Sequence, residues 1–269
     1  MKHPSAGGCF FMQTSSYFHS MNSSAADILR KYAAEYHPVV LFDPAKDKLL
    51  PLDLTANNTA FTEEIYNDIG SFSHYMTEQL KTANAKYAIG GYDEHRQVYS
   101  SSAVFDAVGD SEPRRLHLGI DIWGKPYTAV MSPMDGIVHS VAFNNRQGDY
   151  GATIILTHRL KEMSFYTLYG HLSLNSIKDK QEGQRIERGE IFAEFGISVE
   201  NGHWPPHLHF QVILDMGDWQ GDYPGVCKLS EREKYLENCP DPDLLLKMNK
   251  HILTNQACSE HNNKQDQSR

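Results

Sequence analysis

The segment that most constrains the fold is His207-Leu-His-Phe-Gln-Val-Ile-Leu214, in which polar and apolar side chains alternate. Side chains on a β-strand point alternately to opposite faces, so the imidazoles of His207 and His209 lie on one face. Leu208 and Phe210 then point the other way, into a core, as expected of a half-buried strand. The pattern predicts a strand that buries one face and presents two neighbouring histidines on the other.

Two further segments can supply side chains to the same place. His117-Leu-Gly-Ile-Asp121 has a histidine and a carboxylate four residues apart, and a strand followed by a bend can bring both to one metal ion. Tyr169-Gly-His171-Leu adds another histidine. A catalytic zinc site takes three protein ligands and keeps one position for water. Histidine and aspartate in these segments can supply such a ligand set.

Residues 112 to 214 resemble the M23 family of zinc metallopeptidases, the lysostaphin and LytM type. The family's motifs His-x-x-x-Asp, Tyr-x-His-Leu and His-Leu-His occur here in order. Between them, Ser132-Pro-Met-Asp-Gly-Ile-Val138 is similar to the family's hairpin, and Gly151-Ala-Thr-Ile-Ile-Leu-Thr-His158 to the strand that follows it. The order and spacing of these motifs carry the resemblance.

The resemblance implies a role for each of five residues. His117, Asp121 and His209 correspond to the ligands of one Zn²⁺ per chain, and His171 and His207 to catalytic groups beside the metal. One of these two histidines activates water, and the other stabilises the oxyanion or protonates the departing nitrogen. Histidine titrates near neutrality and can do either. The implied activity is that of an endopeptidase that cleaves amide bonds of peptidoglycan-like peptides.

Two other functions stay open. The chain could be a cytoplasmic M23-like hydrolase of another small amide or peptide, or an inactive module that holds a metal and binds a partner. The filled ligand and accessory positions favour an enzyme. The approach to the last motif, His203-Trp-Pro-Pro206, differs from the family's Ser/Thr-Gly-Pro turn, and Gln211 stands where Glu often follows. His203 lies just before the catalytic strand, so it can either line the cleft or face away from it.

The fold class predicted is β-rich α+β. Strand patterns separated by glycine turns from Leu116 to Leu214 predict an antiparallel β-sheet peptidase domain. The 269 residues are long for one small β domain, so a helical and mixed N-terminal extension is expected to pack on it. The predicted division is a loose N-terminus over 1–22, the extension over 23–110, the peptidase domain with a C-terminal extension over 111–250, and a polar tail over 251–269.

Within the extension, a helix is predicted from Ala25 to Tyr36 and a short strand from Val39 to Phe42. A second helix is expected where apolar residues recur every three or four positions. Its stripe consists of Phe61, Ile65, Ile69, Phe72, Met76 and Leu80. Glu94 and Arg96 could reach the cleft, but a solvated turn with an ion pair is the favoured interpretation.

Composition limits the partners and the compartment. A net charge of −9 and a pI near 5.8 argue against nucleic acid or an anionic membrane, so a peptide or peptidoglycan fragment is the expected substrate. The sequence contains no run of 18 apolar residues, so no membrane span is predicted. The first residues do not read as a secretory signal, which favours the cytoplasm. The cysteines are predicted to be free thiols, with a bridge between Cys227 and Cys239 possible after export; all four are Cys9, Cys227, Cys239 and Cys258.

Overall fold

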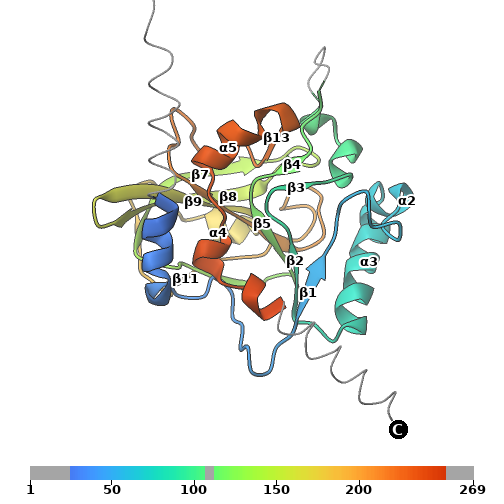
Figure 1. Ribbon diagram of the computed structural model, residues 1–269, viewed down its shortest axis with the longest axis horizontal. Coiled ribbons are helices and arrows are strands. Elements are labelled where there is room, and N and C mark those ends of the chain that lie inside the picture. The colour runs from blue at the N-terminus through green and yellow to red at the C-terminus, as the bar shows by residue number, and fades with distance from the viewer. Residues whose placement is uncertain (1–24, 107–111, 253–269) are drawn as a thin grey trace, which may run out of the picture.

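A computed structural model describes residues 25–106 and 112–252, which are built around an eight-stranded sheet (Figure 1). The strand order is β1-β2-β5-β12-β9-β8-β7-β10, and every neighbouring pair is antiparallel except β1 and β2. The strands of this sheet are β1 (Leu49–Leu52), β2 (Tyr87–Gly90), β5 (Ile120–Trp123), β7 (Gly136–Asn144), β8 (Gly151–Leu160), β9 (Met163–Leu172), β10 (Arg185–Ile186) and β12 (His207–Ile213). The predicted β-rich α+β fold is confirmed.

Two smaller sheets and several short helices complete the described part of the chain. The small sheets are formed by β6 (Ala129–Met131) with β11 (Ile191–Glu194), and by β3 (Glu94–His95), β4 (Leu116–His117) and β13 (Val226–Cys227). Residues 25–31 are helical, and the other α-helices are α2 (Glu63–Tyr66), α3 (Ile69–Thr82), α4 (Leu174–Ile177), α5 (Arg232–Asn238) and α6 (Asp243–Leu246). The 3-10 turns are η1 (Ala33–Glu35), η2 (Val98–Ser101), η3 (Ala103–Phe105) and η4 (Leu229–Glu231).

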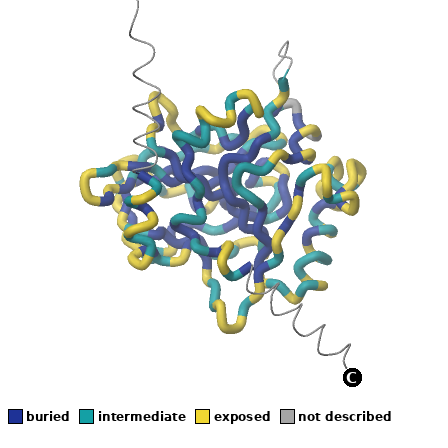
Figure 2. Tube along the Cα trace, viewed as in Figure 1, coloured by how far each residue is buried: buried dark blue, intermediate teal, exposed yellow. Residues whose placement is uncertain are grey.

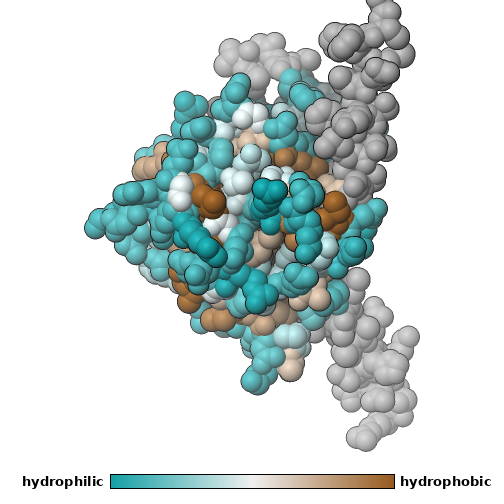
Figure 3. Space-filling view, turned by 90° about the vertical axis from the view of Figure 1, so that its left-hand side faces the viewer, coloured by the Kyte–Doolittle hydropathy of each residue, from teal (hydrophilic) through white to brown (hydrophobic). Residues whose placement is uncertain are grey.

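The sheet forms the core, and the helices lie around its edges and faces. Figure 1 shows α2 and α3 beside β1 and β2 at one end and the helix over 25–31 at the other. Burial is concentrated in the central strands, while the exposed segments are peripheral loops (Figure 2). Seen from the side in Figure 3, the surface is mostly hydrophilic, with hydrophobic side chains in small groups. None of the described helices is long and apolar enough for a membrane span.

The N-terminal part of the chain shares the main sheet with the strand that carries Asp121. β2 pairs with β5 through Ile89 opposite Ile122 and Gly90 opposite Asp121. β1 adds to β2 as the edge strand, the position in a sheet where Pro51 is tolerated. β1 and β2 therefore continue the sheet of the strand that carries Asp121, whereas the predicted domain boundaries stay a prediction.

The strand predicted from the His207 pattern is present as β12, but it is buried on both faces rather than one. Leu208 and Phe210 belong to the main hydrophobic cluster, as expected. The opposite face, with His207 and His209, is also less than 4% exposed. The half-buried expectation was wrong because segments distant in sequence cover this face.

The extension differs from its predicted secondary structure in two places. The amphipathic stripe is divided into α2 and α3, because the Asp68 side chain accepts a hydrogen bond from the backbone N–H of Ser71 at 2.7 Å and caps a new helix. Val39 to Phe42 is irregular and is not a strand. Val39 is buried and its carbonyl accepts a hydrogen bond from the backbone N–H of Met131, but the segment does not continue this contact as a ladder. The first helix is confirmed in position, although it ends at residue 31 before η1.

His158 on β8 gives the fold a dependence on pH. Its Nδ1 lies 2.9 Å from the Asp135 carbonyl and its Nε2 lies 2.7 Å from the Thr167 hydroxyl. Burial lowers the pKa of His158 from 6.5 to about 4. The unfolded chain therefore binds a proton that the folded chain does not between these pH values, so the contribution of His158 is present above pH 6.5 and is lost as the pH falls toward 4.

We expect His158→Gln to weaken the fall in unfolding free energy between pH 7 and pH 4.5, measured by urea denaturation. Each pKa unit is worth about 1.4 kcal/mol, so the effect is on the order of 2 to 3 kcal/mol. His74→Gln, which removes an exposed histidine from α3, is the control and should leave the pH dependence unchanged. Equal pH dependence in wild type and His158→Gln would contradict the assignment.

Candidate metal centre and active site

The structure brings together His117, Asp121 and His209, the three residues predicted as ligands. They come from β4, β5 and β12, and the register of β5 and β12 places Asp121 directly opposite His209. His117 Nε2 lies 2.9 Å from His209 Nδ1 and 3.3 Å from Asp121 Oδ1, and His209 Nδ1 lies 3.1 Å from the same oxygen. All three residues are buried.

Hydrogen bonds on the outer side of both histidine rings fix their tautomers. His117 Nδ1 donates to the Gly91 carbonyl at 2.8 Å, which leaves Nε2 with a lone pair. The side-chain nitrogen of Gln211 donates to the Pro224 carbonyl, so its Oε1 faces His209 Nε2 at 2.9 Å and accepts from it. His209 Nδ1 therefore also carries a lone pair. Such outer partners orient metal-ligating histidines in proteins.

These contacts direct three acceptor atoms at one point. Two neutral imidazole nitrogens and a carboxylate oxygen repel one another when no proton or cation lies among them. A tetrahedral zinc ion with bonds of about 2.0–2.1 Å separates its ligand atoms by about 3.3 Å, close to the separations of 2.9 to 3.3 Å found here. The N₂O donor set, with one side open to a cavity, fits a zinc ion with a free coordination position.

The charges around the cluster keep Asp121 ionised. Burial alone raises the pKa of a carboxyl group, but His117 and Arg96 lower the pKa of Asp121 well below its ordinary value. Burial and the nearby Arg96 lower the pKa of His117 to about 4. The cluster is thus ready to bind a cation at neutral pH, with an anionic carboxylate and a neutral imidazole.

His171 and His207 form a second pair next to these ligands. Their rings stack with centroids 4.1 Å apart. His171 Nδ1 donates to the Asn201 carbonyl and His207 Nδ1 to the Pro205 carbonyl, each at 2.8 Å, so Nε2 of each neutral ring is a proton acceptor. Burial lowers the pKa of His207 to about 4, and burial together with His207 lowers the pKa of His171 well below its ordinary value.

The backbone around His171 is held in an uncommon conformation. His171 has φ of 62°, in the left-handed region that costs a non-glycine residue on the order of 1 kcal/mol. Its N–H donates to Tyr150 and its carbonyl accepts from Gly196, so hydrogen bonds on both sides keep it there. A side chain at Gly151 would collide with the backbone of Asn201, so glycine at this position lets the loop that binds His171 Nδ1 approach.

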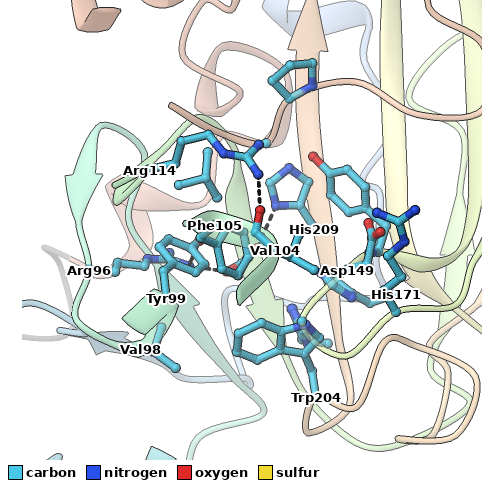
Figure 4. A pocket seen from close by; sticks show the side chains of 18 of the residues that line it. Arg96, Val98, Tyr99, Val104, Phe105, Arg114, Asp149, His171, Trp204 and His209 are labelled. Carbon is cyan, nitrogen blue, oxygen red and sulfur yellow. Dashed lines mark hydrogen bonds and ion pairs between the residues drawn. The ribbon is translucent and has the colours of Figure 1, made fainter. Parts of the chain in front are cut away.

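A cavity of about 310 Å³ opens in front of the histidines. Figure 4 shows His209 in the middle of its lining, with Arg96 and Tyr99 to one side and Asp149 and His171 to the other. Its aromatic wall includes Trp123, which stacks on His207 at 3.9 Å, and Trp204. Both indole N–H groups are buried and have no hydrogen-bond acceptor among the described residues.

The other sequence candidates fall in different places. His203 is exposed and borders a neighbouring cavity, outside the one lined by His209. The solvated turn expected at Glu94 and Arg96 is wrong: the ion pair is present at 2.6 Å, but Arg96 is 1% exposed and reaches Asp121. Cys227 and Cys239 are buried free thiols, as predicted, and Cys9 and Cys258 lie outside the described residues.

Sequence reasoning missed the groups that orient the histidines. Gln211 had a detectable signal, because it lies two residues after His209 on the same strand face. Gly91 and Asn201 accept hydrogen bonds from His117 and His171 through their backbone carbonyl groups. Any residue type has such a carbonyl, so the identity of these two residues does not indicate that they orient the histidines.

Comparison with known proteins agrees with this geometry. Residues 115–220 match the sequence model of peptidase family M23, and the match includes all three candidate ligands. This segment belongs to peptidase family M23. The chain is 34% identical over 185 residues to an uncharacterized metalloprotease of Haemophilus influenzae, and 27% identical over 195 residues to an L-Ala--D-Glu endopeptidase of Bacillus subtilis. These alignments cover 66% and 65% of the chain, but 36% and 57% of the two relatives.

Solved structures of peptidases are also similar. The catalytic domain of lysostaphin from Staphylococcus simulans is 16% identical with a TM-score of 0.34, and covers 60% of this chain and 97% of that domain. A zinc containing peptidase from Vibrio cholerae is 29% identical with a TM-score of 0.29, and covers 36% of this chain and 27% of that one. The M23 segment accounts for the strands from β4 to β12, while β1, β2 and β3 precede it.

We expect the ligand cluster to bind one divalent metal ion per chain and thereby to stabilise the fold. A ligand that binds only the folded state at 100 times its Kd adds about 2.7 kcal/mol, so added Zn²⁺ should raise the thermal midpoint of metal-stripped protein. His209→Ala should abolish this rise, and the matched control His203→Ala should keep it. A full rise in His209→Ala would contradict the ligand assignment.

Proposed function

We propose that the protein is a zinc-dependent endopeptidase that cleaves amide bonds of peptidoglycan-like peptides. The observation that carries the proposal is the convergence of His117 Nε2, Asp121 Oδ1 and His209 Nδ1 within 3.3 Å of one another, beside His171 and His207 on the wall of one cavity. The membership of residues 115–220 in family M23 and the name of the Haemophilus influenzae relative support a metallopeptidase.

The two groups of residues divide the work. His117, Asp121 and His209 would hold the zinc ion, which supplies an activated water and a Lewis acid for the substrate carbonyl. His171 and His207 hold their Nδ1 protons in hydrogen bonds to carbonyl groups and keep Nε2 free to take a proton. One of them would accept the proton of the attacking water at Nε2. The other could stabilise the oxyanion or protonate the leaving amine only after it had taken up a proton at its own Nε2. Burial keeps both rings neutral before the reaction.

The cavity favours a narrow substrate with charges of both signs. Besides Arg96 and Asp121 at the ligand cluster, its lining includes two more arginines and two more aspartates, Arg114, Arg146, Asp149 and Asp222. Burial raises the pKa of both aspartates, although the two arginines oppose the rise. Arginine binds carboxylates and aspartate binds amines, so a peptide that carries both groups fits the wall. The Bacillus subtilis relative, named for cleavage between L-Ala and D-Glu, supports a peptidoglycan-like peptide.

A hydrolase of another small amide or peptide in the cytoplasm is the second candidate, favoured by the small volume of the cavity, about 310 Å³. The test compares the metal-loaded protein on three substrates: intact peptidoglycan sacculi, soluble stem peptides released from them, and unrelated linear peptides. We expect cleavage of the soluble stem peptides. Cleavage of the unrelated peptides alone would favour the second candidate, and no cleavage at all would identify an inactive metal-holding module.

His171→Ala and His207→Ala are expected to keep the metal but to lower kcat about 10² to 10⁴-fold, the usual contribution of a general acid or base. Elemental analysis of each variant checks the metal, and turnover of the cleaved stem peptide checks the rate. His139→Ala is the control, because His139 lies half-buried on β7, outside the described lining of the cavity. A metal-free variant would move that histidine into the ligand set.

A further inference from the structure

Arg96 is a buried cation bound on all sides by the metal centre and its surroundings. Its side chain is 2% exposed, and its Nη1 donates to Asp121 Oδ2 at 2.5 Å and to the Tyr99 hydroxyl at 3.1 Å. Nε donates to Glu94 Oε2 at 2.6 Å, and Nη2 to the Gly91 carbonyl at 3.2 Å. These four acceptors compensate for the loss of solvation of a buried guanidinium, a cost that an exposed ion pair does not have.

The two oxygens of the Asp121 carboxylate are divided between different partners. Oδ2 accepts from Arg96, while Oδ1 faces His117 and His209 at 3.3 Å and 3.1 Å. With Oδ2 held by a short charge-assisted hydrogen bond, only Oδ1 remains for a metal ion. The guanidinium would therefore limit Asp121 to one metal bond and leave a coordination position open.

The same stretch of chain also orients a second ligand. The Gly91 carbonyl accepts from both Arg96 Nη2 and His117 Nδ1, so it connects the arginine to the histidine ligand. A side chain at Gly90 would lie 2.8 Å from Arg96 Nη2, so glycine at this position makes room for the guanidinium. Residues 90–96 precede the M23 segment over 115–220, which places these two outer contacts outside that segment.

We propose that Arg96 is a positioning residue that fixes Asp121 as a ligand through one oxygen, and that residues 90–96 form part of the metal centre. The inference rests on the proposed function of this cluster as a metal site. Replacement of such outer partners typically costs 10 to 100-fold in metal affinity.

The main test is the double variant Glu94→Gln/Arg96→Gln. It removes one negative and one positive charge, so the net charge beside the metal is unchanged and any effect reports the lost hydrogen bonds. We expect Zn²⁺ affinity, measured by competition with a chromophoric chelator, to fall about 10 to 100-fold. We also expect weaker visible absorption of the Co²⁺-loaded protein, because four-coordinate Co²⁺ absorbs strongly and Co²⁺ with a second carboxylate oxygen bound absorbs weakly.

Two further variants keep the test sharp. Arg96→Lys retains the charge but cannot donate in fork geometry to Asp121, Glu94 and Gly91 together, so we expect a smaller fall in affinity in the same direction. It decides the question if the double variant does not fold. Arg232→Gln removes an exposed ion pair to Asp93 in the same turn and should leave Zn²⁺ affinity and the Co²⁺ spectrum unchanged.

The outcomes separate this inference from the function on which it rests. A wild-type protein that binds no Zn²⁺ overturns both. A wild-type protein that binds one Zn²⁺, with the same affinity and Co²⁺ spectrum in a folded double variant or in Arg96→Lys, overturns the positioning role alone. A fall in affinity in Arg232→Gln as large as that in Arg96→Lys also overturns it, because loosening of the turn would then explain the effect.

Discussion

Three lone pairs directed at one buried point are the constraint on which the rest of the structure depends. His117, Asp121 and His209 bring two neutral nitrogens and a carboxylate oxygen within 3.3 Å of one another, and such an arrangement is unfavourable without a cation. The arrangement is maintained because hydrogen bonds on the outer side of each side chain fix the tautomers of His117 and His209 and the orientation of Asp121. Part of the free energy of folding holds these acceptors together against their mutual repulsion, and binding of a metal ion would remove that repulsion.

Two of the three groups that orient the proposed ligands come from an earlier part of the chain. Gly91 holds His117, Arg96 holds Asp121, and Gln211 holds His209. The first two precede the M23 segment, and the third lies on the same strand as its ligand. A metal centre formed by these residues would depend on residues 90–96 for the orientation of two of its three proposed ligands.

The extension also supports the accessory histidines through aromatic packing. The ring centroids of Phe72 on α3 and Trp123 are 5.5 Å apart. Trp123 stacks on His207, and the His207 ring stacks on His171. A continuous row of rings thus connects a helix of the extension to the proposed proton-transfer pair. Because packed side chains leave little free volume, the orientation of His207 depends on how α3 sits against the sheet.

The sequence by itself determined the β12 strand, the β-rich fold class and the set of His117, Asp121, His171, His207 and His209 that meets at one site. Alternation of period two and the spacing within each motif are local signals, and they survive folding because each motif lies in a short stretch of chain. The break before α3 was also local, since Asp68 and Ser71 form a cap, but the longer apolar stripe suggested one helix. Only the tertiary structure decided the burial of Arg96, the covered second face of β12 and the carbonyl partners of the histidines. These depend on contacts between segments far apart in the chain and on backbone atoms common to all residues, so no residue pattern records them.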